Sequence, residues 1–294
     1  MKNAFLFVAT LLCWAPTWYI IKFQFGYVDP IISVFYRLGL SCIIFFSILL
    51  ITKKQLKYSL NYHLWFATLG GCLFSFNYIF FYLANTYLIS GLVCVAFSAN
   101  LLFNIIGEKI FFKRNASIAT WFAAFLGGLG IFIIFNHEII NFNLNDDTHI
   151  GIALSFIATL FWSCGNMVHT RNSKNKFPFF QSVAFGLMYG SIFTLLAAKI
   201  QGAEILIELN IKYISALFYL SIFGTVLAFY LYLSLVDNIG SDRAGYIGVM
   251  MPVLALLISS YFENLQWSTN LLIGLPILLI GSVLILNQKN KIII

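Results

Sequence analysis

Long apolar runs are the feature that most limits how this chain can fold. Ten such runs recur along the 294 residues, with short polar breaks between them. Each is close to the length, about 20 residues, that a helix needs to cross the roughly 30 Å hydrocarbon core of a bilayer. They cover approximately residues 3–22, 30–51, 62–84, 88–111, 116–135, 149–169, 179–199, 212–235, 242–262 and 268–287.

The composition excludes a water-soluble domain. Only 9% of the residues are charged and 61% are hydrophobic, whereas soluble proteins have about 25% charged residues. In lipid every backbone N–H and C=O must be paired internally, which leaves helical bundles or closed barrels. Barrels need short stretches that alternate apolar and polar residues, and this chain has continuous apolar runs instead. We therefore expect an all-α integral membrane protein with ten transmembrane helices.

Lysine and arginine gather in alternate breaks, which predicts the orientation of the chain. Cytoplasmic loops of membrane proteins carry an excess of these residues. With a cytoplasmic N-terminus and ten spans, both termini are cytoplasmic and 13 of the 17 basic residues fall on that side. They are Lys2, Lys53, Lys54, Lys57, Lys109, Lys113, Arg114, Arg171, Lys174, Lys176, Arg243, Lys289 and Lys291. Because the basic residues form short groups between apolar runs, the net charge of +7 is interpreted as an orientation signal and not as a nucleic-acid-binding patch.

The two halves of the sequence echo each other. A tryptophan lies near the middle of the first run of each half (Trp14 and Trp162), and an acid closes the fourth run of each (Glu108 and Glu263). This predicts two five-helix repeats, residues 1–140 and 149–288. Five spans is an odd number, so the second repeat must be inverted relative to the first, as in many alternating-access carriers. Tight hairpins are expected at 85–91 and 237–245, close to the gates of such a carrier.

Further motifs occur in a recognisable order, and on them the chain resembles the drug/metabolite transporter superfamily, in particular its ten-span EamA-type members, over nearly all of its length. Besides the paired tryptophans and acids, the matching features are Lys22, Pro30 and Arg37 in the first repeat, Tyr82–Ala84, and the run Tyr246–Pro252 that precedes Glu263. The fourth run departs from the pattern, because Ser98–Asn100 stands where members often have a proline, and no proline kink is expected there.

The resemblance implies a central substrate cavity between the halves and a secondary transporter, exporter or exchanger. Its cargo would be small metabolites such as amino acids or amines, moved by alternating access across the bacterial inner (plasma) membrane. The implied partners are a small-molecule substrate and the lipid bilayer, with the chain acting as a monomer or a homodimer.

Charged, amide and aromatic residues within the apolar runs are the candidates for lining that cavity. Arg37 is the ionisable residue well inside a run, where it serves either as counter-charge to a substrate carboxylate or as a structural donor to nearby carbonyls. Intramembrane amides must be paired, so they either contact the substrate or bond between helices. Aromatic rings near the centre offer stacking surfaces. The candidates are Trp14, Trp18, Arg37, Asn77, Tyr78, Tyr82, Asn100, Asn104, Trp162, Asn166, Tyr230 and Tyr246.

No acid is expected at mid-membrane, which favours a facilitator or exchanger over a cation/proton antiporter. Such antiport relies on a buried carboxylate with a raised pKa. His169 ends the sixth run beside Arg171 and is expected to be solvated at the interface, although it or a tyrosine could relay protons.

A membrane-embedded enzyme and a non-transporting scaffold are the alternative functional classes. A membrane-embedded enzyme would need clustered histidines, acids or cysteines at one depth, but His63, His137, His149 and His169 are scattered at run ends. We therefore predict no catalytic residue, cofactor or metal, and interpret the loop Asn143–His149 as a hydrophilic loop. A non-transporting membrane scaffold is the other alternative. Glycines at 186 and 190, at 127, 128 and 130, and at 274 and 281 are predicted to be close-packing faces.

Overall fold

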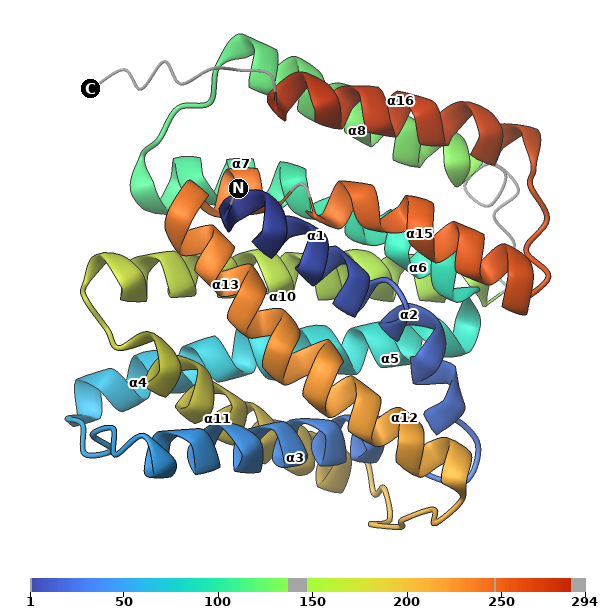
Figure 1. Ribbon diagram of the computed structural model, residues 1–294. Helices are drawn as coiled ribbons and strands as arrows, with labels where there is room; N and C mark the ends of the chain where they lie inside the picture. The colour runs from blue at the N-terminus through green and yellow to red at the C-terminus, as the bar shows by residue number, and fades with distance from the viewer. Residues whose placement is uncertain (1, 137–146, 246, 287–294) are drawn as a thin grey trace.

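The computed structural model describes residues 2–136, 147–245 and 247–286, and the regular structure in these residues is helical throughout (Figure 1). By length and composition, seven described helices are able to cross a membrane, and three further apolar helices are shorter. The expectation of an all-helical membrane protein is therefore confirmed. The long ones are Lys2–Gln24, Pro30–Ile51, Leu60–Tyr87, Ser90–Phe112, Thr148–Lys174, Phe179–Ile200 and Ile211–Ile239; the shorter ones are Ile118–Ile134, Met250–Phe262 and Thr269–Gly281.

The first and fourth segments are each interrupted near the middle. The first consists of α1 (Lys2–Trp14), α2 (Thr17–Ile20) and the 3₁₀ turn η1 (Ile21–Gln24). Its break falls at Pro16, which has no N–H to donate and whose ring clashes with the preceding turn. The fourth consists of α6 (Ser90–Phe97) and α7 (Asn100–Phe112) and breaks at Ser98 without any proline. There the Ser98 hydroxyl donates to the Gly248 carbonyl oxygen at 2.9 Å, so a cross-helix bond accompanies the interruption.

The third and eighth segments each contain a π-helix in the middle. The third consists of α4 (Leu60–Leu69), η2 (Gly70–Phe76) and α5 (Asn77–Tyr87). The eighth consists of α12 (Ile211–Ser221), η3 (Ile222–Leu227) and α13 (Ala228–Ile239). A π-helix inserts an extra residue into the turn and is frequent at functional sites, which draws attention to these two places.

The remaining segments consist of one helix each, except that the short α14 precedes α15 in the ninth. Asp29 caps the start of α3, where its carboxylate accepts from the Ile31 amide at 2.8 Å and Pro30 occupies the first turn. Asn210 caps α12 in the same manner. The bounds are α3 (Pro30–Ile51), α8 (Ile118–Ile134), α10 (Thr148–Lys174), α11 (Phe179–Ile200), α14 (Ser241–Ala244), α15 (Ile247–Phe262) and α16 (Thr269–Leu286).

Helices from the two parts of the chain pack against one another in pairs. The pair α8–α16 forms one side of the bundle, and α3 and α11 lie together on the opposite side (Figure 1). Between them α10 packs on α5, α15 on α6, and α1 on α13. These pairings bring helices from both halves to the centre.

Glycines allow several of these helices to touch backbone to backbone. A Cβ built on Gly70 would lie 2.5 Å from the Gly186 carbonyl oxygen and 2.9 Å from the Gly190 nitrogen. A Cβ on Gly130 would lie 2.7 Å from the Gly274 oxygen. A Cβ on Gly281 would lie 2.8 Å from the Gly127 nitrogen. The predicted packing faces at these glycines are confirmed, whereas a Cβ on Gly127 or Gly128 would itself meet no atom within 4 Å.

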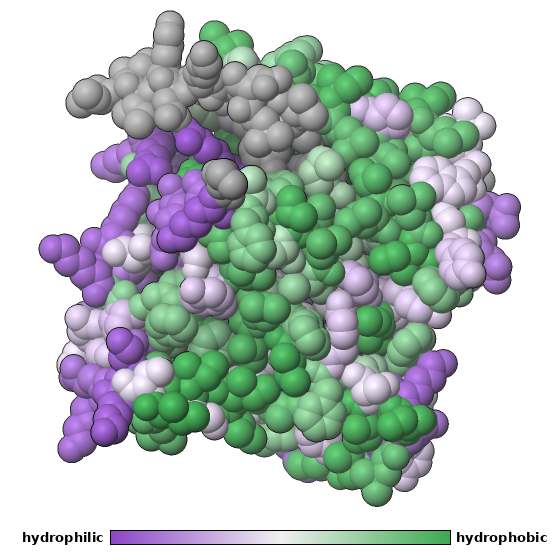
Figure 2. All heavy atoms as spheres, in the orientation of Figure 1, coloured by the Kyte–Doolittle hydropathy of each residue, from purple (hydrophilic) through white to green (hydrophobic). Residues whose placement is uncertain are grey.

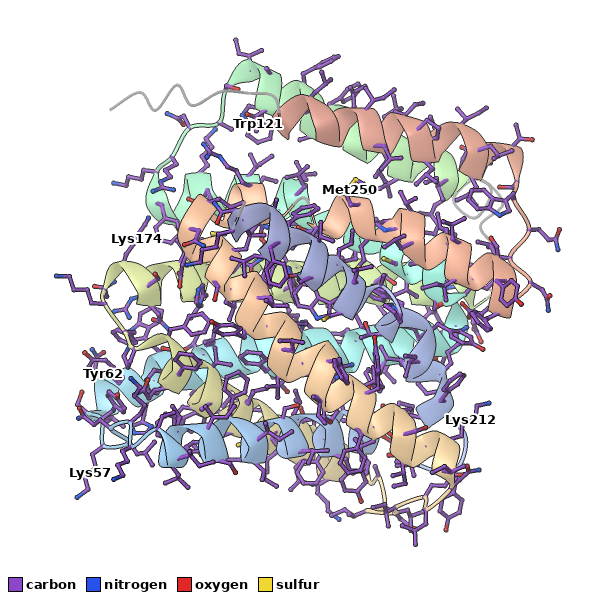
Figure 3. All side chains as sticks on the ribbon, in the orientation of Figure 1. Lys57, Tyr62, Trp121, Lys174, Lys212 and Met250 are labelled. Atoms are coloured by element: carbon purple, nitrogen blue, oxygen red, sulfur yellow. The ribbon has the colours of Figure 1, made fainter. Side chains whose placement is uncertain are left out.

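The surface has two hydrophilic edges with an apolar band between them (Figure 2). Lys57 and Lys174 lie at one of these edges and Lys212 lies at the opposite one (Figure 3). This is the arrangement expected of a protein whose apolar belt contacts lipid, and it separates basic residues in space as the loop pattern separates them in sequence.

Candidate functional site

A small cavity of about 50 Å³ lies at the centre of the bundle. It brings together side chains from α1, α2, η1, α3, α5, α6, α10 and α15, so both parts of the chain line it. Seven of the residues predicted from the sequence are here: Trp14, Trp18, Arg37, Asn77, Tyr78, Tyr82 and Trp162. The other lining residues are Thr17, Ile21, Phe81, Phe97 and Met251.

Three of the five lining residues that were not predicted could have been found from helical spacing in the sequence. Thr17 and Ile21 lie on the helix face of Trp14 and Trp18, at the spacings of three, four and seven residues that share a face. Phe81 follows Tyr78 at the same kind of interval. Phe97 and Met251 had no such marker, because their helices contain no polar residue facing this cavity.

Aromatic rings join the two halves around the cavity. The ring centroids of Trp14 and Trp162 are 5.3 Å apart at 76°, an edge-to-face contact between α1 and α10. Trp162 also meets Phe97 edge to face at 5.2 Å. Such contacts are favourable beyond the area that they bury. The indole N–H groups of Trp14 and Trp18 are used within the protein, donating to the Gly224 oxygen at 3.0 Å and to the Met251 sulfur at 2.8 Å.

Arg37 projects from α3 into this cavity and is only 2% exposed. Its Nε donates to Thr225 Oγ1 at 2.9 Å, and one Nη donates to the Gly224 oxygen at 3.1 Å. Both acceptors belong to the π-helix η3. Gly224 has no side chain to obstruct this contact, since a Cβ there would lie 3.1 Å from the Arg37 Nη2 atom and 2.7 Å from Thr17. The π-helix therefore positions the guanidinium.

Two tyrosines of α5 complete the surroundings of Arg37. The guanidinium lies 4.5 Å from the centroid of the Tyr78 ring, a cation–π distance. It also donates to the hydroxyls of Tyr78 and Tyr82, each at 3.4 Å. Tyr82 in turn donates to the Gln24 side-chain oxygen at 2.7 Å. Nearby, the Asn77 side-chain oxygen is buried and has no hydrogen-bond partner among the described residues.

Three of the predicted amides lie outside this cavity and bond to one another. Asn104 Oδ1 on α7 accepts from Ser163 at 2.8 Å and from Asn166 at 3.4 Å, both on α10. Asn104 also donates to Asn100 at 3.4 Å. Of the two roles left open by the sequence, these contacts show interhelical bonding between α7 and α10.

The predicted tyrosines of the second half are placed differently. Tyr230 is 41% exposed and stacks on Phe180 at 5.7 Å, away from the cavity. Tyr232, two residues further, is buried and lies 5.0 Å from Trp14 and 5.3 Å from Trp162, ring centroid to centroid. Tyr246 falls outside the described residues.

A larger apolar cavity of about 230 Å³ lies between α7, α8, α10 and α16. None of the predicted site residues lines it, and apart from Ser98 its lining side chains are apolar or glycine. The polar groups therefore converge at the smaller, central cavity, which makes that one the candidate site.

An ion pair closes one end of the bundle. Lys22 Nζ lies 2.6 Å from the Glu263 carboxylate, whose side chain is 8% exposed. The same carboxylate accepts from the hydroxyls of Ser90 and Ser259, the latter at 2.6 Å. The two serine oxygens are 3.0 Å apart. We call Lys22, Ser90, Ser259 and Glu263 the latch. The latch ties the end of the first segment to the start of α6 and to the end of α15.

The latch makes stability depend on pH. Burial alone would raise the pKa of Glu263, but hydrogen bonds and charge from Lys22, with Ser259 and Ser90, outweigh it and hold the pKa below its usual value. Because the pKa is depressed, the latch stabilises fully above the ordinary glutamate pKa, about 4.3, and this stabilisation is lost as pH falls below that value and through the lower pKa of Glu263 in the folded protein. In detergent, the free energy of unfolding should decline by about 1–3 kcal/mol as pH falls below about 4.3. The variant Glu263→Gln should lack this part of the decline, and an equal decline in both proteins would contradict the assignment.

At the other end of the bundle His169 pairs with Asp237. His169 Nε2 lies 3.1 Å from Asp237 Oδ1, which links α10 to α13. The expectation of a solvated, interfacial histidine is wrong, because His169 is 2% exposed. The packing of α10 against α13 covers a position that the sequence places at the end of a run. No group of three metal-ligating side chains occurs in the part of the chain that the structure describes, and Asp146 of the Asn143–His149 loop is outside it.

The comparison with protein families agrees with this architecture. The model of the EamA-like transporter family matches residues 1–136 and 149–287, nearly the whole chain. The chain belongs to the EamA-like transporter family. Among curated proteins it is similar to an uncharacterized transporter of Clostridium kluyveri, 22% identical over 99% of this chain and 95% of that one. It is also similar to the uncharacterized transporter YvbV of Bacillus subtilis, 23% identical over 99% of this chain and 93% of that one.

Solved structures show the same fold. One crystal structure, at 16% sequence identity, superposes on this EamA-like transporter with a TM-score of 0.71 and covers 96% of both chains. With the family and the bacterial relatives, this establishes a multi-pass membrane transporter. The resemblance inferred from the sequence motifs is confirmed.

Proposed function

We propose that this EamA-like transporter is a secondary carrier, an exporter or exchanger, that moves small metabolites such as amino acids or amines across the bacterial inner membrane by alternating access. The observation that carries the proposal is the central cavity, which Trp14 and Arg37 line from the first matched segment and Trp162 and Met251 from the second. A site shared between two bodies changes its accessibility when they move against each other.

The helix pairing supports two related halves. In the first half, α1 of the first segment packs on α13 of the eighth. In the second half, α10, the sixth segment, packs on α5 of the third. A two-fold axis predicts this reciprocal relation. The second and seventh, fourth and ninth, and fifth and tenth segments pack as partners. The π-helices η2 and η3 occupy the third segment of each half. Ten spans in two inverted repeats, with the Lys57 edge in the cytoplasm, are part of the proposal.

Closing contacts at both ends support gating around the cavity. The latch ties the hairpin at 85–91 to α15 at one end. The pair His169–Asp237 joins α10 to α13 near the hairpin at 237–245 at the other end. We propose that rocking of the halves opens these contacts alternately, and one chain encloses the cavity, so that a monomer suffices.

The test is counterflow in proteoliposomes with labelled amino acids, amines and nucleoside-like metabolites, with and without a pH gradient. Saturable, trans-stimulated flux of one solute class, insensitive to pH, is the expected result. Trp162→Ala should lower it at least tenfold if stacking at the site contributes more than about 1.4 kcal/mol. Trp121→Ala, on the exposed face of α8, is the matched control and should leave it unchanged.

Other outcomes would sink parts of the proposal. Flux that never saturates would indicate a channel, and silence across the panel would favour a non-transporting scaffold. Transport only under an inward acid gradient would mean that protons drive the carrier after all, and would direct attention to His169 and Asp237.

A further inference from the structure

The central cavity contains a positive charge with no counter-ion. The arginine guanidinium remains protonated in proteins, and Arg37 is buried. Within residues 2–136, 147–245 and 247–286 the ion pairs are Lys22–Glu263, Arg114–Glu108 and His169–Asp237, and Arg37 is in none of them. A buried charge is unfavourable unless it is paired, so the site holds a charge that a ligand could neutralise.

The hydrogen bonds and the ring contact of Arg37 within the described residues are all with neutral groups. A threonine hydroxyl and a backbone carbonyl accept from it, and two tyrosine hydroxyls accept at the longer distance of 3.4 Å. These bonds orient the guanidinium without removing its charge. Its Nη1 atom has only the long bond to Tyr82, which leaves donor capacity on that side.

The rest of the lining carries no charge that would neutralise Arg37. Apart from Arg37, it consists of aromatic and aliphatic side chains, one threonine, one methionine and Asn77. Trp14 and Trp162 could attract an ammonium group through their faces, but that attraction is weaker than the repulsion by a nearby full charge of the same sign in a desolvated site.

We infer that the cavity selects a small solute that carries a carboxylate on an apolar or aromatic body, with Arg37 as the residue that determines this specificity. The inference rests on the proposed carrier function and narrows its substrate class, excluding amines that lack a carboxylate. The planar fork of Arg37 pairs with the carboxylate through two parallel hydrogen bonds. Because the cavity of about 50 Å³ is smaller than such a solute, the halves must move apart to admit it, and the rings of Trp14, Trp18 and Phe97 then cover the apolar body. Asn77, whose side-chain oxygen has no partner, accepts an N–H when the solute has one.

The test uses probes that share a phenylethyl body and differ in the charged groups attached to it. Binding of 3-phenylpropanoate, phenylalanine and phenethylamine to the purified protein in detergent is measured by calorimetry. The first two should bind, and phenethylamine should bind at least roughly tenfold more weakly. Arg37→Gln should weaken 3-phenylpropanoate binding by roughly 30-fold or more, as expected when one partner of a buried, hydrogen-bonded charge pair is removed, and should erase the preference over phenethylamine.

Two further variants control for folding and for net charge. Arg37→Lys keeps the charge and loses the planar fork, so its affinity for 3-phenylpropanoate should fall between those of wild type and Arg37→Gln. If Arg37→Gln is not monodisperse, Arg37→Lys alone is compared with wild type. Arg114→Gln makes the same change in net charge at the partly exposed pair with Glu108 and should bind as wild type does.

Three outcomes would overturn the inference: equal or tighter binding of phenethylamine to wild type, carboxylate binding that survives Arg37→Gln unchanged, or no binding by either carboxylate probe. The first would be consistent with a carrier of a different substrate class. Failure of the carrier function itself looks different, because no solute of any charge would then show saturable counterflow in proteoliposomes.

Discussion

A disulfide across the latch is expected to stop transport completely and reversibly. The hydroxyl oxygens of Ser90 and Ser259 are 3.0 Å apart, and cysteines at both positions could reach the S–S bond length of about 2.05 Å with little movement. Because Ser90 begins α6 and Ser259 lies near the end of α15, the bond would hold these helices closed. A carrier that alternates must separate them once per cycle.

The measurement is counterflow in a background in which the five free cysteines Cys13, Cys42, Cys72, Cys94 and Cys164 are replaced by alanine. The double variant Ser90→Cys/Ser259→Cys should transport when it is reduced. When it is oxidised and nearly all molecules are cross-linked, it should lose more than about 90% of its flux. Reductant should restore it.

A second cysteine pair separates gating from simple oxidation damage. Ser117 and Thr120 have their hydroxyl oxygens 2.9 Å apart, within the first turn of α8. A disulfide there would join residues of one turn and constrain no helix pair, so that flux should survive oxidation. If the cross-linked latch variant still transports at the wild-type rate, the opening of α6 from α15 is not part of the cycle.

Replacing Gly70 by alanine is expected to destabilise the protein, whereas the same replacement at Gly128 should not. The Gly70 Cβ would collide with the backbone of Gly186 and Gly190, and backbone atoms cannot rotate away. Forcing η2 and α11 apart should cost about 1–3 kcal/mol, as overpacking usually does. At Gly128 the added methyl meets no atom within 4 Å, and the higher helix propensity of alanine should stabilise by up to about 1 kcal/mol.

The two variants are compared by the fraction that remains monodisperse after heating in detergent. The sign of the difference matters most, because both substitutions add one methyl group to a helix. Equal heat stability of Gly70→Ala and wild type would show that α11 can move away from η2 at little cost, and that the glycine contact is not a packing constraint.

The candidate site was partly predictable from local pattern. Trp14 stands out because a tryptophan recurs near the middle of the first run of each half, and Arg37 because a charge within an apolar run is costly unless it faces the interior. Tyr78 and Tyr82 lie one turn apart on α5 and reach the same cavity. By contrast, an amide within an apolar run indicates only that it needs a hydrogen-bond partner. The partners of Asn104 lie on α10 and not in the cavity.

Tyr230 shows why the second half was harder to predict. Tyr230 and Tyr232 are two positions apart on α13 and so lie about 200° apart around the helix, which allows only one of them to face the tryptophans. Tyr232 takes that position, with its ring centroid 5.0 Å from that of Trp14, and Tyr230 faces outward. The rotation of α13 about its axis is set by the helices packed against it, and apolar periodicity does not give it.

The sequence by itself determined that this is a helical membrane protein, where most of its apolar segments lie, and which family it resembles. These follow from segment length, charge distribution and motif order, all of which are properties of short stretches of chain. Only the tertiary structure decided that Lys22 meets Glu263, that the Gly224 carbonyl supports Arg37, and that no described carboxylate does. Such contacts depend on the rotation and depth of each helix, which are set by the helices packed against it.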